Sequence, residues 1–158
     1  MNVIHATDPS SAIAIAASVH DLAPVTYEKV YLIFDLGAGY LDVGLISVED
    51  SFYEVKSKTG RIALGGEDFE NAIMDFCISS FKVSTGIDIT KNKKACVRLK
   101  RECATALRSL SVSKSAEVFV ESISEGEDLE VDITREVFEE LCDEKFKTCV
   151  QAIDRALL

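Results

Sequence analysis

Two aspartates and the glycine-rich turn between them form the stretch of this sequence best suited to chemistry. Asp35 closes the apolar run 30–34, and Asp42 lies near the start of a second apolar run, 41–48. Apolar runs on both sides of a glycine turn predict a strand, a tight hairpin and a second strand. Glycine permits positive φ and leaves backbone N–H groups uncovered, so the turn that begins at Gly37 is suited to holding an anion.

The two carboxylates add a second chemical possibility at the same hairpin. Asp35 and Asp42 stand at the rim of the turn. Mg²⁺ prefers oxygen ligands and keeps several of its waters, so one or two carboxylates are enough to hold it. The segment therefore indicates a phosphate-and-metal site, and the alternative is an ordinary hairpin turn.

The composition limits the class of protein and of partner. The chain has 158 residues, 47% of them hydrophobic, which is typical of a globular domain. Its formal net charge of −10 argues against nucleic acid and anionic membrane as partners. An acidic protein can still bind a nucleotide, because backbone N–H groups and a metal ion supply the local positive field.

The cysteines and the hydropathy predict a reduced, cytoplasmic chain. The five cysteines are scattered and form no C-x-x-C pair; they are Cys77, Cys96, Cys103, Cys142 and Cys149. The apolar segment 12–17 is far shorter than the ~20 residues that a membrane-spanning helix needs. The N-terminus lacks the basic start of a signal peptide.

The elements that must position the turn can be read from periodicity. Three antiparallel strands are expected over 30–35, 41–48 and 52–59, with a turn at Glu49-Asp50. Helices are expected over 9–19, from Glu67, over 92–110 and after a Thr134 cap, and a second hairpin over about 118–133. This order predicts an α/β fold in which residues 66–133 are inserted between a three-stranded sheet and the helix that returns to it.

Several side chains of these elements have expected positions. Helical spacing predicts a core stripe in the first long helix, made of Phe69, Ile73, Phe76, Cys77 and Phe81. Other buried positions are expected at Val97, Cys103, Leu107, Val137, Phe138, Leu141 and Phe146. Arg135 and Glu139 lie four residues apart on a helix and are expected to pair.

Five motifs are spread over almost the whole chain, at residues 8–12, 35–42, 64–70, 98–111 and 133–141. In this order they resemble motifs of one family, the seventy-kilodalton heat-shock chaperones. Residues 35–42, D-L-G-A-G-Y-L-D, are similar to the phosphate-binding hairpin in the second lobe of that family, and the other four segments resemble further motifs of the same lobe. The resemblance implies a partial actin-like, ribonuclease H-like ATPase lobe with a mixed sheet. Its incomplete core would be 1–65 and 134–158, and 66–133 would be the base-binding subdomain.

The resemblance also implies a nucleotide, ATP or ADP with Mg²⁺. Gly37, Ala38 and Gly39 would meet the phosphates through backbone N–H groups. Asp35 matches a carboxylate that holds the metal through water. Asp8 replaces a glutamate near the same metal, and its alternative role is an N-cap before Pro9. Asp35 and Asp8 are expected to be remnants of a catalytic site rather than confident catalytic residues.

Two departures from the family affect the phosphate side. Ala38 adds a methyl group where the family has glycine, at a cost of about 1 kcal/mol if the residue needs positive φ. Tyr40 stands where the family has threonine, and its phenol cannot make the same contact. Tyr40 either fills part of the phosphate space or is a packing residue.

The base side departs further. Arg108 is expected to stack on the base, or else to be a solvent-facing arginine, and Ser111 matches a family serine. Ala104 and Leu107 replace the glutamate and lysine that contact the ribose. Hydrogen bonds to charged groups contribute about 1.5–3 kcal/mol each, so losing two weakens binding by roughly a hundredfold or more.

The expected function is a chaperone nucleotide-binding lobe that binds nucleotide weakly and hydrolyses little ATP alone. The family's first lobe and its later phosphate loop have no counterpart in the 158 residues. The alternative is a non-catalytic interaction module, or a natural or engineered fragment, that docks partners such as nucleotide-exchange factors. An open sheet edge beside 30–35 would also permit self-association.

Overall fold

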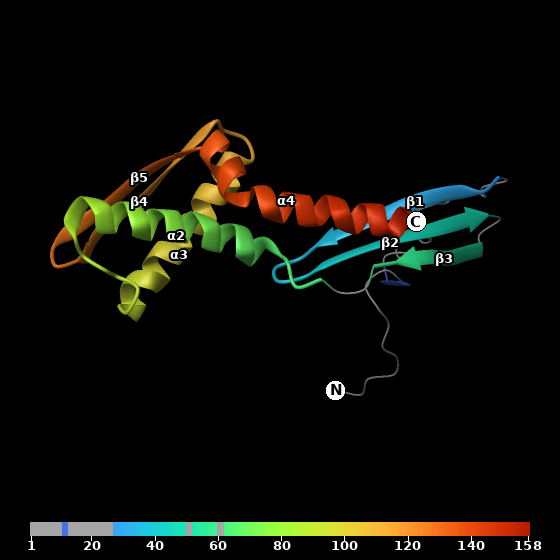
Figure 1. The fold of residues 1–158 in the computed structure, drawn as a ribbon, viewed down its shortest axis with the longest axis horizontal. Coiled ribbons are helices and arrows are strands. Elements are labelled where there is room, and N and C mark those ends of the chain that lie inside the picture. Colours follow the sequence, from blue (N-terminus) through green and yellow to red (C-terminus); the bar gives the residue numbers. More distant parts are fainter. Residues whose placement is uncertain (1–10, 13–26, 50–51, 60–61) are drawn as a thin grey trace. The chain divides into compact units, whose positions relative to one another are not determined.

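The computed structural model describes residues 11–12, 27–49, 52–59 and 62–158. The predicted helix over 9–19 lies outside these residues except for 11–12. Asp8, which precedes that helix, and Asp50 of the predicted turn also lie outside them. The elements are β1 (Lys29–Leu36), β2 (Leu41–Glu49), β3 (Phe52–Lys58), α2 (Gly66–Thr85), α3 (Lys93–Leu110), β4 (Ser115–Ser124), β5 (Glu127–Thr134) and α4 (Arg135–Leu157). The α/β class predicted from the sequence is confirmed (Figure 1).

The first three strands form one antiparallel sheet in the order β1-β2-β3. The register places Leu36 opposite Leu41 and Asp35 opposite Asp42, so the hairpin tip lies directly beyond these pairs. Because successive side chains alternate between faces, Asp35 shares a face with the buried Ile33. The other face meets α4, since the Ser57 hydroxyl donates a hydrogen bond to the Ala156 carbonyl.

The chain divides into two compact units. One unit comprises Met1–Gly65 and Phe146–Leu158 and contains the three-stranded sheet. The other comprises Gly66–Lys145 and contains α2, α3, the β4-β5 hairpin and the first part of α4. The two units are described separately below.

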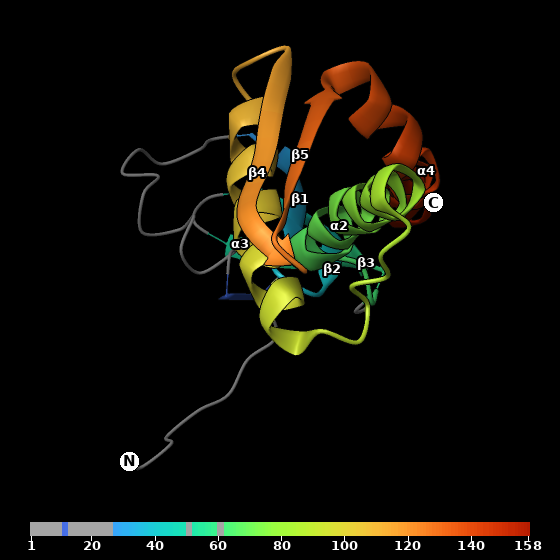
Figure 2. The same ribbon diagram turned by 90° about the vertical axis from the view of Figure 1, so that its left-hand side faces the viewer.

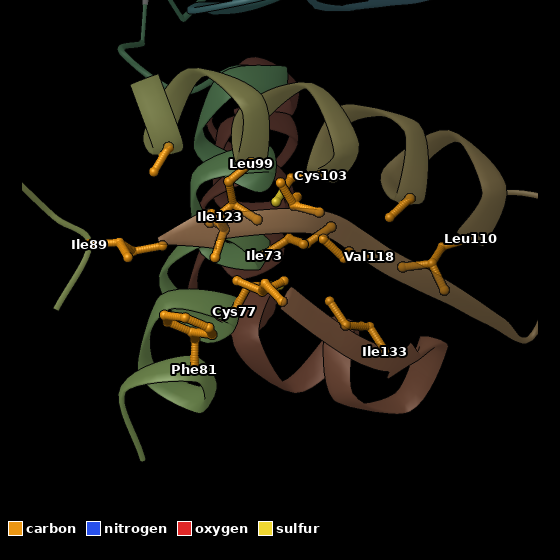
Figure 3. Close-up of a cluster of buried hydrophobic side chains, with 14 residues drawn as sticks. Ile73, Cys77, Phe81, Ile89, Leu99, Cys103, Leu110, Val118, Ile123 and Ile133 are labelled. Carbon is orange, nitrogen blue, oxygen red and sulfur yellow. The ribbon is translucent and has the colours of Figure 1, made fainter. Parts of the chain in front are cut away.

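The second unit has its own hydrophobic core (Figure 3). Buried positions of α2, α3, β4 and β5 meet there, including Ile73, Cys77, Leu99, Val118 and Ile133. The predicted core stripe of α2 is confirmed, with Phe76 packed at its margin. All five cysteines are free thiols, and Cys77 and Cys103 lie within this core.

Side-chain caps explain where two helices begin. The Asn92 side chain accepts a hydrogen bond from the Ala95 N–H at 3.1 Å and starts α3. The Thr134 hydroxyl accepts one from the Val137 N–H at 3.3 Å, as the sequence predicts, and starts α4. Capping satisfies N–H groups that have no partner within the helix.

Several side-chain predictions are wrong. Val97 is 72% exposed because it lies on the outer side of α3, while Ala95, Leu99 and Cys103 form the buried side. Leu141 and Phe146 are also exposed. A partly exposed apolar residue at helical spacing cannot be told from a core residue by periodicity alone.

Arg135 has different partners from the predicted Glu139. Its guanidinium donates to the Leu110 carbonyl at 3.1 and 2.8 Å and to the Ser113 carbonyl at 2.9 Å. Arg135 therefore satisfies carbonyls at the end of α3 and in the following turn.

Within the described residues, no helix is long and apolar enough to cross a bilayer.

Candidate functional site: a hairpin bend supported by a glycine

The bend joins β1 to β2 through four residues, Gly37 to Tyr40. The Gly37 N–H donates to the Tyr40 carbonyl at 2.9 Å, which closes the turn. The amide of Gly37 is thus used inside the hairpin, although the sequence suggested that it faces a ligand. Among the described residues, no hydrogen bond of the Ala38 or Gly39 N–H is found. These two amides are the donors that the bend can offer to an anion.

The bend does not use positive φ. The described residues with positive φ are Ser122, Glu125, Gly86 and Gly126, all in the other unit. The cost considered for Ala38 therefore does not arise. A Cβ on Gly37 would meet only the Tyr40 oxygen at 3.5 Å, and one on Gly39 would meet nothing within 4 Å.

Gly65 supports the bend from behind by direct backbone packing. A Cβ on Gly65 would lie 2.4 Å from Ala38 C, from Ala38 O and from Gly39 N. No real Cβ sits so close to backbone atoms, so only glycine fits here without moving the bend. Gly65 is buried, and its backbone lies against the peptide whose N–H belongs to Gly39.

A short backbone bridge holds the same segment. Leu41 and Ile62 exchange two hydrogen bonds, from Leu41 N to Ile62 O at 2.9 Å and from Ile62 N to Leu41 O at 3.0 Å. Leu41 is fully buried. Residues 62–65 therefore fix the position of the bend immediately before α2 begins at Gly66.

Asp35 and Asp42 leave the same face of the hairpin, directly opposite each other in the register. Both residues are half-buried. Two like charges at opposed positions repel, so a cation beside them would be stabilising. No cluster of three or more metal-ligating side chains occurs in the described residues. The pair suits Mg²⁺, which takes one or two carboxylates and completes its shell with water and phosphate.

Tyr40 lies at the edge of the bend with 44% of its surface exposed. Its carbonyl accepts the Gly37 hydrogen bond, so its backbone is part of the turn. The side chain is accessible to solvent rather than buried in the sheet. Because its side chain is exposed, Tyr40 remains a candidate to lie beside a phosphate at the bend.

The residues expected on the base side lie on α3, in the other compact unit. Arg108 is exposed on the last turn, and its guanidinium donates to the Thr105 hydroxyl at 3.2 Å. Ser111 is the C-cap, and its hydroxyl donates to the Leu107 carbonyl at 3.4 Å. Leu107 packs against the core, which explains an apolar residue there.

The structure thus groups the expected site residues in two sets. Asp35 and the bend form one set in the first unit, and Arg108 and Ser111 form the other in the second unit. Asp8 lies outside the described residues. The sequence analysis missed Gly65, whose signal was the pair of adjacent glycines at 65 and 66.

Arg98 is a second residue without a role in the sequence analysis. Its guanidinium donates to the Glu121 carbonyl at 2.5 Å and to the Ser122 carbonyl at 3.2 Å. Ser122 has φ of 43°, and its N–H donates to the Asp128 carboxylate at 2.6 Å. Arg98 therefore ties α3 to a left-handed residue of β4, a structural task within the second unit.

Comparison with known proteins gives the lineage. The family model described as Hsp70 protein matches residues 1–158. The "Heat shock 70 kDa protein" of Neurospora crassa is 39% identical over 157 residues, which is 99% of this chain and 24% of that protein. The "Heat shock cognate 70 kDa protein 3" of Dictyostelium discoideum is 38% identical over 99% of this chain and 25% of its own length.

A third relative, the "Heat shock 70 kDa protein" of Penicillium citrinum, is 37% identical over 99% of this chain and 31% of its own length. The chain spans about a quarter to a third of the relatives it matches. The α/β architecture agrees with part of an actin-like nucleotide-binding domain. The chain belongs to the Hsp70 family, as a lobe of that family's nucleotide-binding domain.

Proposed function

We propose that the bend 37–40 binds the phosphates of ATP or ADP, with Mg²⁺ held beside it by Asp35 through water. The observation that carries the proposal is the Gly65 contact, which holds the Ala38–Gly39 peptide in place and leaves two amide donors at the tip. A bend held in place before a ligand arrives loses less entropy on binding. The metal, when bound, would neutralise phosphate charge.

Arg108 would contribute to the base side, by stacking its guanidinium on the ring. Its bond to Thr105 is a single hydrogen bond at an exposed site, so little is lost when the side chain turns toward a base. Ser111 would be adjacent at the end of α3. Ala104 and Leu107 offer no hydrogen bond to a ribose.

Binding by this chain is expected to be weak. Gly37 has no amide to offer, and the ribose contacts are missing. Phosphoryl transfer needs charge placed around the phosphate from several sides. The 158-residue protein should therefore show no useful steady-state ATPase activity. A clear ATPase signal from pure protein that is lost in Asp35→Asn contradicts this expectation.

A thermal-shift titration with Mg-ADP tests the binding proposal. Ligand that binds only the folded form raises the melting temperature by mass action. At about 10 mM Mg-ADP the midpoint should rise by about one to a few degrees. Asp35→Asn and Arg108→Ala should each reduce the rise, and Val97→Ala, an exposed change on α3, should not. No shift in the unmodified protein overturns the proposal.

The wider biological role is also a proposal. Family membership supports a part in ATP-dependent protein folding and in the stress response, together with chaperone components such as nucleotide-exchange factors. The free state of all five cysteines supports a reducing, cytoplasmic location. Self-association would use β1, which has a strand partner on one side only among the described residues. Exposed apolar side chains line this strand: Val30, Leu32, Phe34 and Leu36.

A further inference from the structure

A groove in the second unit lies between α2 and β5. Its volume is about 400 Å³, and both walls belong to the compact unit Gly66–Lys145. Figure 2 shows α2 running beside the β4-β5 hairpin on the side of β5. The helix contributes Phe76, Ser80, Phe81 and Ser84, and the strand contributes residues 128–132.

The lining shows that the groove follows the edge of the strand. Side chains of a strand alternate between its two faces, so a pocket on one face would be lined by every second residue. Here five consecutive residues, 128–132, line it. In the two-stranded sheet β4-β5, β5 has a strand on one side only among the described residues. Alternate N–H and C=O groups of β5 therefore point into the groove.

The dimensions suit an extended polypeptide. Residues 128–132 span about 13 Å at the rise of a strand. The α2 wall runs from Phe76 to Ser84, about 12 Å at the rise of a helix. The two walls therefore match over the length of four or five extended residues. The volume is within the range of ligand sites.

The charges specify the chemistry of the occupant. On β5 the exposed side chains at the groove are carboxylates, namely Asp128, Glu130 and Asp132, and no lysine or arginine lines it. The apolar lining that an occupant can reach is Phe76 and Val131, which are half-buried, while Phe81 and Leu129 beneath them belong to the core. Asp128 also accepts the Ser122 N–H, which leaves its negative charge in place. A second copy of this chain is a poor occupant, because its net charge is −10.

We propose that this groove binds an extended basic segment of another protein, which pairs with the outer edge of β5 as an added strand. Apolar side chains of the segment face Phe76 and Val131, and its alternate Lys or Arg side chains lie opposite Glu130 and Asp132. Opposite charges on neighbouring strands are stabilising, and strand addition supplies backbone hydrogen bonds. The site is independent of nucleotide binding.

The test uses the whole chain and a capped peptide of alternating Lys and Val. Its binding is followed by amide chemical shifts, and shifts are expected over 128–132 and along the Phe76–Ser84 wall. A peptide of alternating Glu and Val should not bind. The Lys-Val peptide with N-methylated backbone amides should bind far more weakly, because it cannot pair with β5.

Matched double variants separate the groove from general charge attraction. Glu130→Gln with Asp132→Asn should weaken binding by roughly two- to thirtyfold, as expected for two exposed ion pairs. Glu139→Gln with Glu140→Gln changes the net charge equally on α4, outside the groove, and should leave binding unchanged. Equal losses in both variants overturn the proposal. The proposal is also overturned if the basic peptide does not bind, or if the N-methylated peptide binds equally well.

Discussion

Gly65 is the residue that connects the sequence most directly to the proposed phosphate site. Its hydrogen occupies a place where a Cβ would meet three backbone atoms of the Ala38–Gly39 peptide at 2.4 Å. The atoms on the other side are main chain, so the clash cannot be relieved by turning a side chain. The glycine acts by letting two backbone segments touch, while the bend itself needs no left-handed residue.

Gly65→Ala should destabilise the first unit by about 1–3 kcal/mol, the usual cost of overpacking. Gly39→Ala is the matched control, because its Cβ would meet nothing within 4 Å, and it should change stability by less than about 0.5 kcal/mol. The chain has four tyrosines and no tryptophan, and all four tyrosines lie at 27–53. Tyrosine fluorescence during urea unfolding therefore follows this unit alone. Equal midpoints for both variants would contradict the contact.

The cysteines differ in reactivity for a physical reason. The hydrogen bond with Cys103, followed by burial, raises the pKa of the Cys77 thiol far above its usual range. Burial also raises the pKa of Cys142 and of Cys149. Cys96 is only half-buried. The thiolate is the reactive form, so accessibility and pKa together set the order of labelling.

An aromatic disulfide reagent at pH 8 should therefore modify Cys96 first in the folded protein. Cys77 and Cys103 should react only when the second unit unfolds, since both are fully buried. Mass spectrometry of tryptic peptides at increasing reaction times gives the order. Cys96→Ser should remove the early phase. Early modification of Cys77 in folded protein would be inconsistent with the core in Figure 3.

Among the elements, the connection after α2 carries the clearest electrostatic signal. The Lys82 ammonium donates to the Asp88 carboxylate at 2.8 Å, and the Thr90 hydroxyl and N–H donate to it at 2.7 and 3.0 Å. These hydrogen bonds hold the pKa of Asp88 well below its ordinary value, and the bond from Lys82 has the largest effect. They fold the chain back from α2 toward the start of α3.

The sign of the resulting pH dependence follows from linkage. A carboxylate whose pKa is lowered in the folded state stabilises the protein at pH values above its unfolded-state pKa, which is about 4. This stabilisation is lost as the pH falls through the pKa of the folded state. Asp88→Asn should therefore lower the melting temperature at pH 7, and the difference should shrink steadily as the pH falls below about 4. Lys82→Met should give a similar profile, and the double variant little more. A difference that does not change with pH would rule out this role of Asp88.

The elements were largely predictable and the contacts between them were not. The β1-β2 hairpin follows from two apolar runs around a turn, and α3 from Asn92 and a regular apolar stripe. The spacing of apolar residues in the sequence could not show that Val97 is exposed, because helical spacing defines the apolar side of a helix only approximately. Nor could it show the Gly65 contact with the bend, which joins positions 27 residues apart. Arg135 was assigned to a local pair, whereas distant carbonyls at the end of α3 bind it.

For the molecule as a whole, family membership is firmer than any single site. Motifs spread over the entire chain agree with a family match over residues 1–158. The departures Tyr40, Ala104 and Leu107 fall on expected ligand contacts, while the folded elements around them are kept. The core residues therefore hold the Hsp70 architecture. In the proposed function, affinity for nucleotide depends on a few groups outside this core, chiefly the Ala38 and Gly39 amides, Asp35 and Arg108.

The most direct measurement is a titration of ¹⁵N-labelled protein with Mg-ADP, followed through the amide signals. The account predicts saturable shifts of Ala38 and Gly39, which inorganic pyrophosphate with Mg²⁺ reproduces and adenosine alone does not, because these amides meet phosphate. Gly65→Ala should weaken or abolish them, and Gly39→Ala should keep the Ala38 shift. Saturable ADP binding that leaves both amides unmoved, or no shift anywhere at millimolar Mg-ADP, would contradict the phosphate-binding role of the bend.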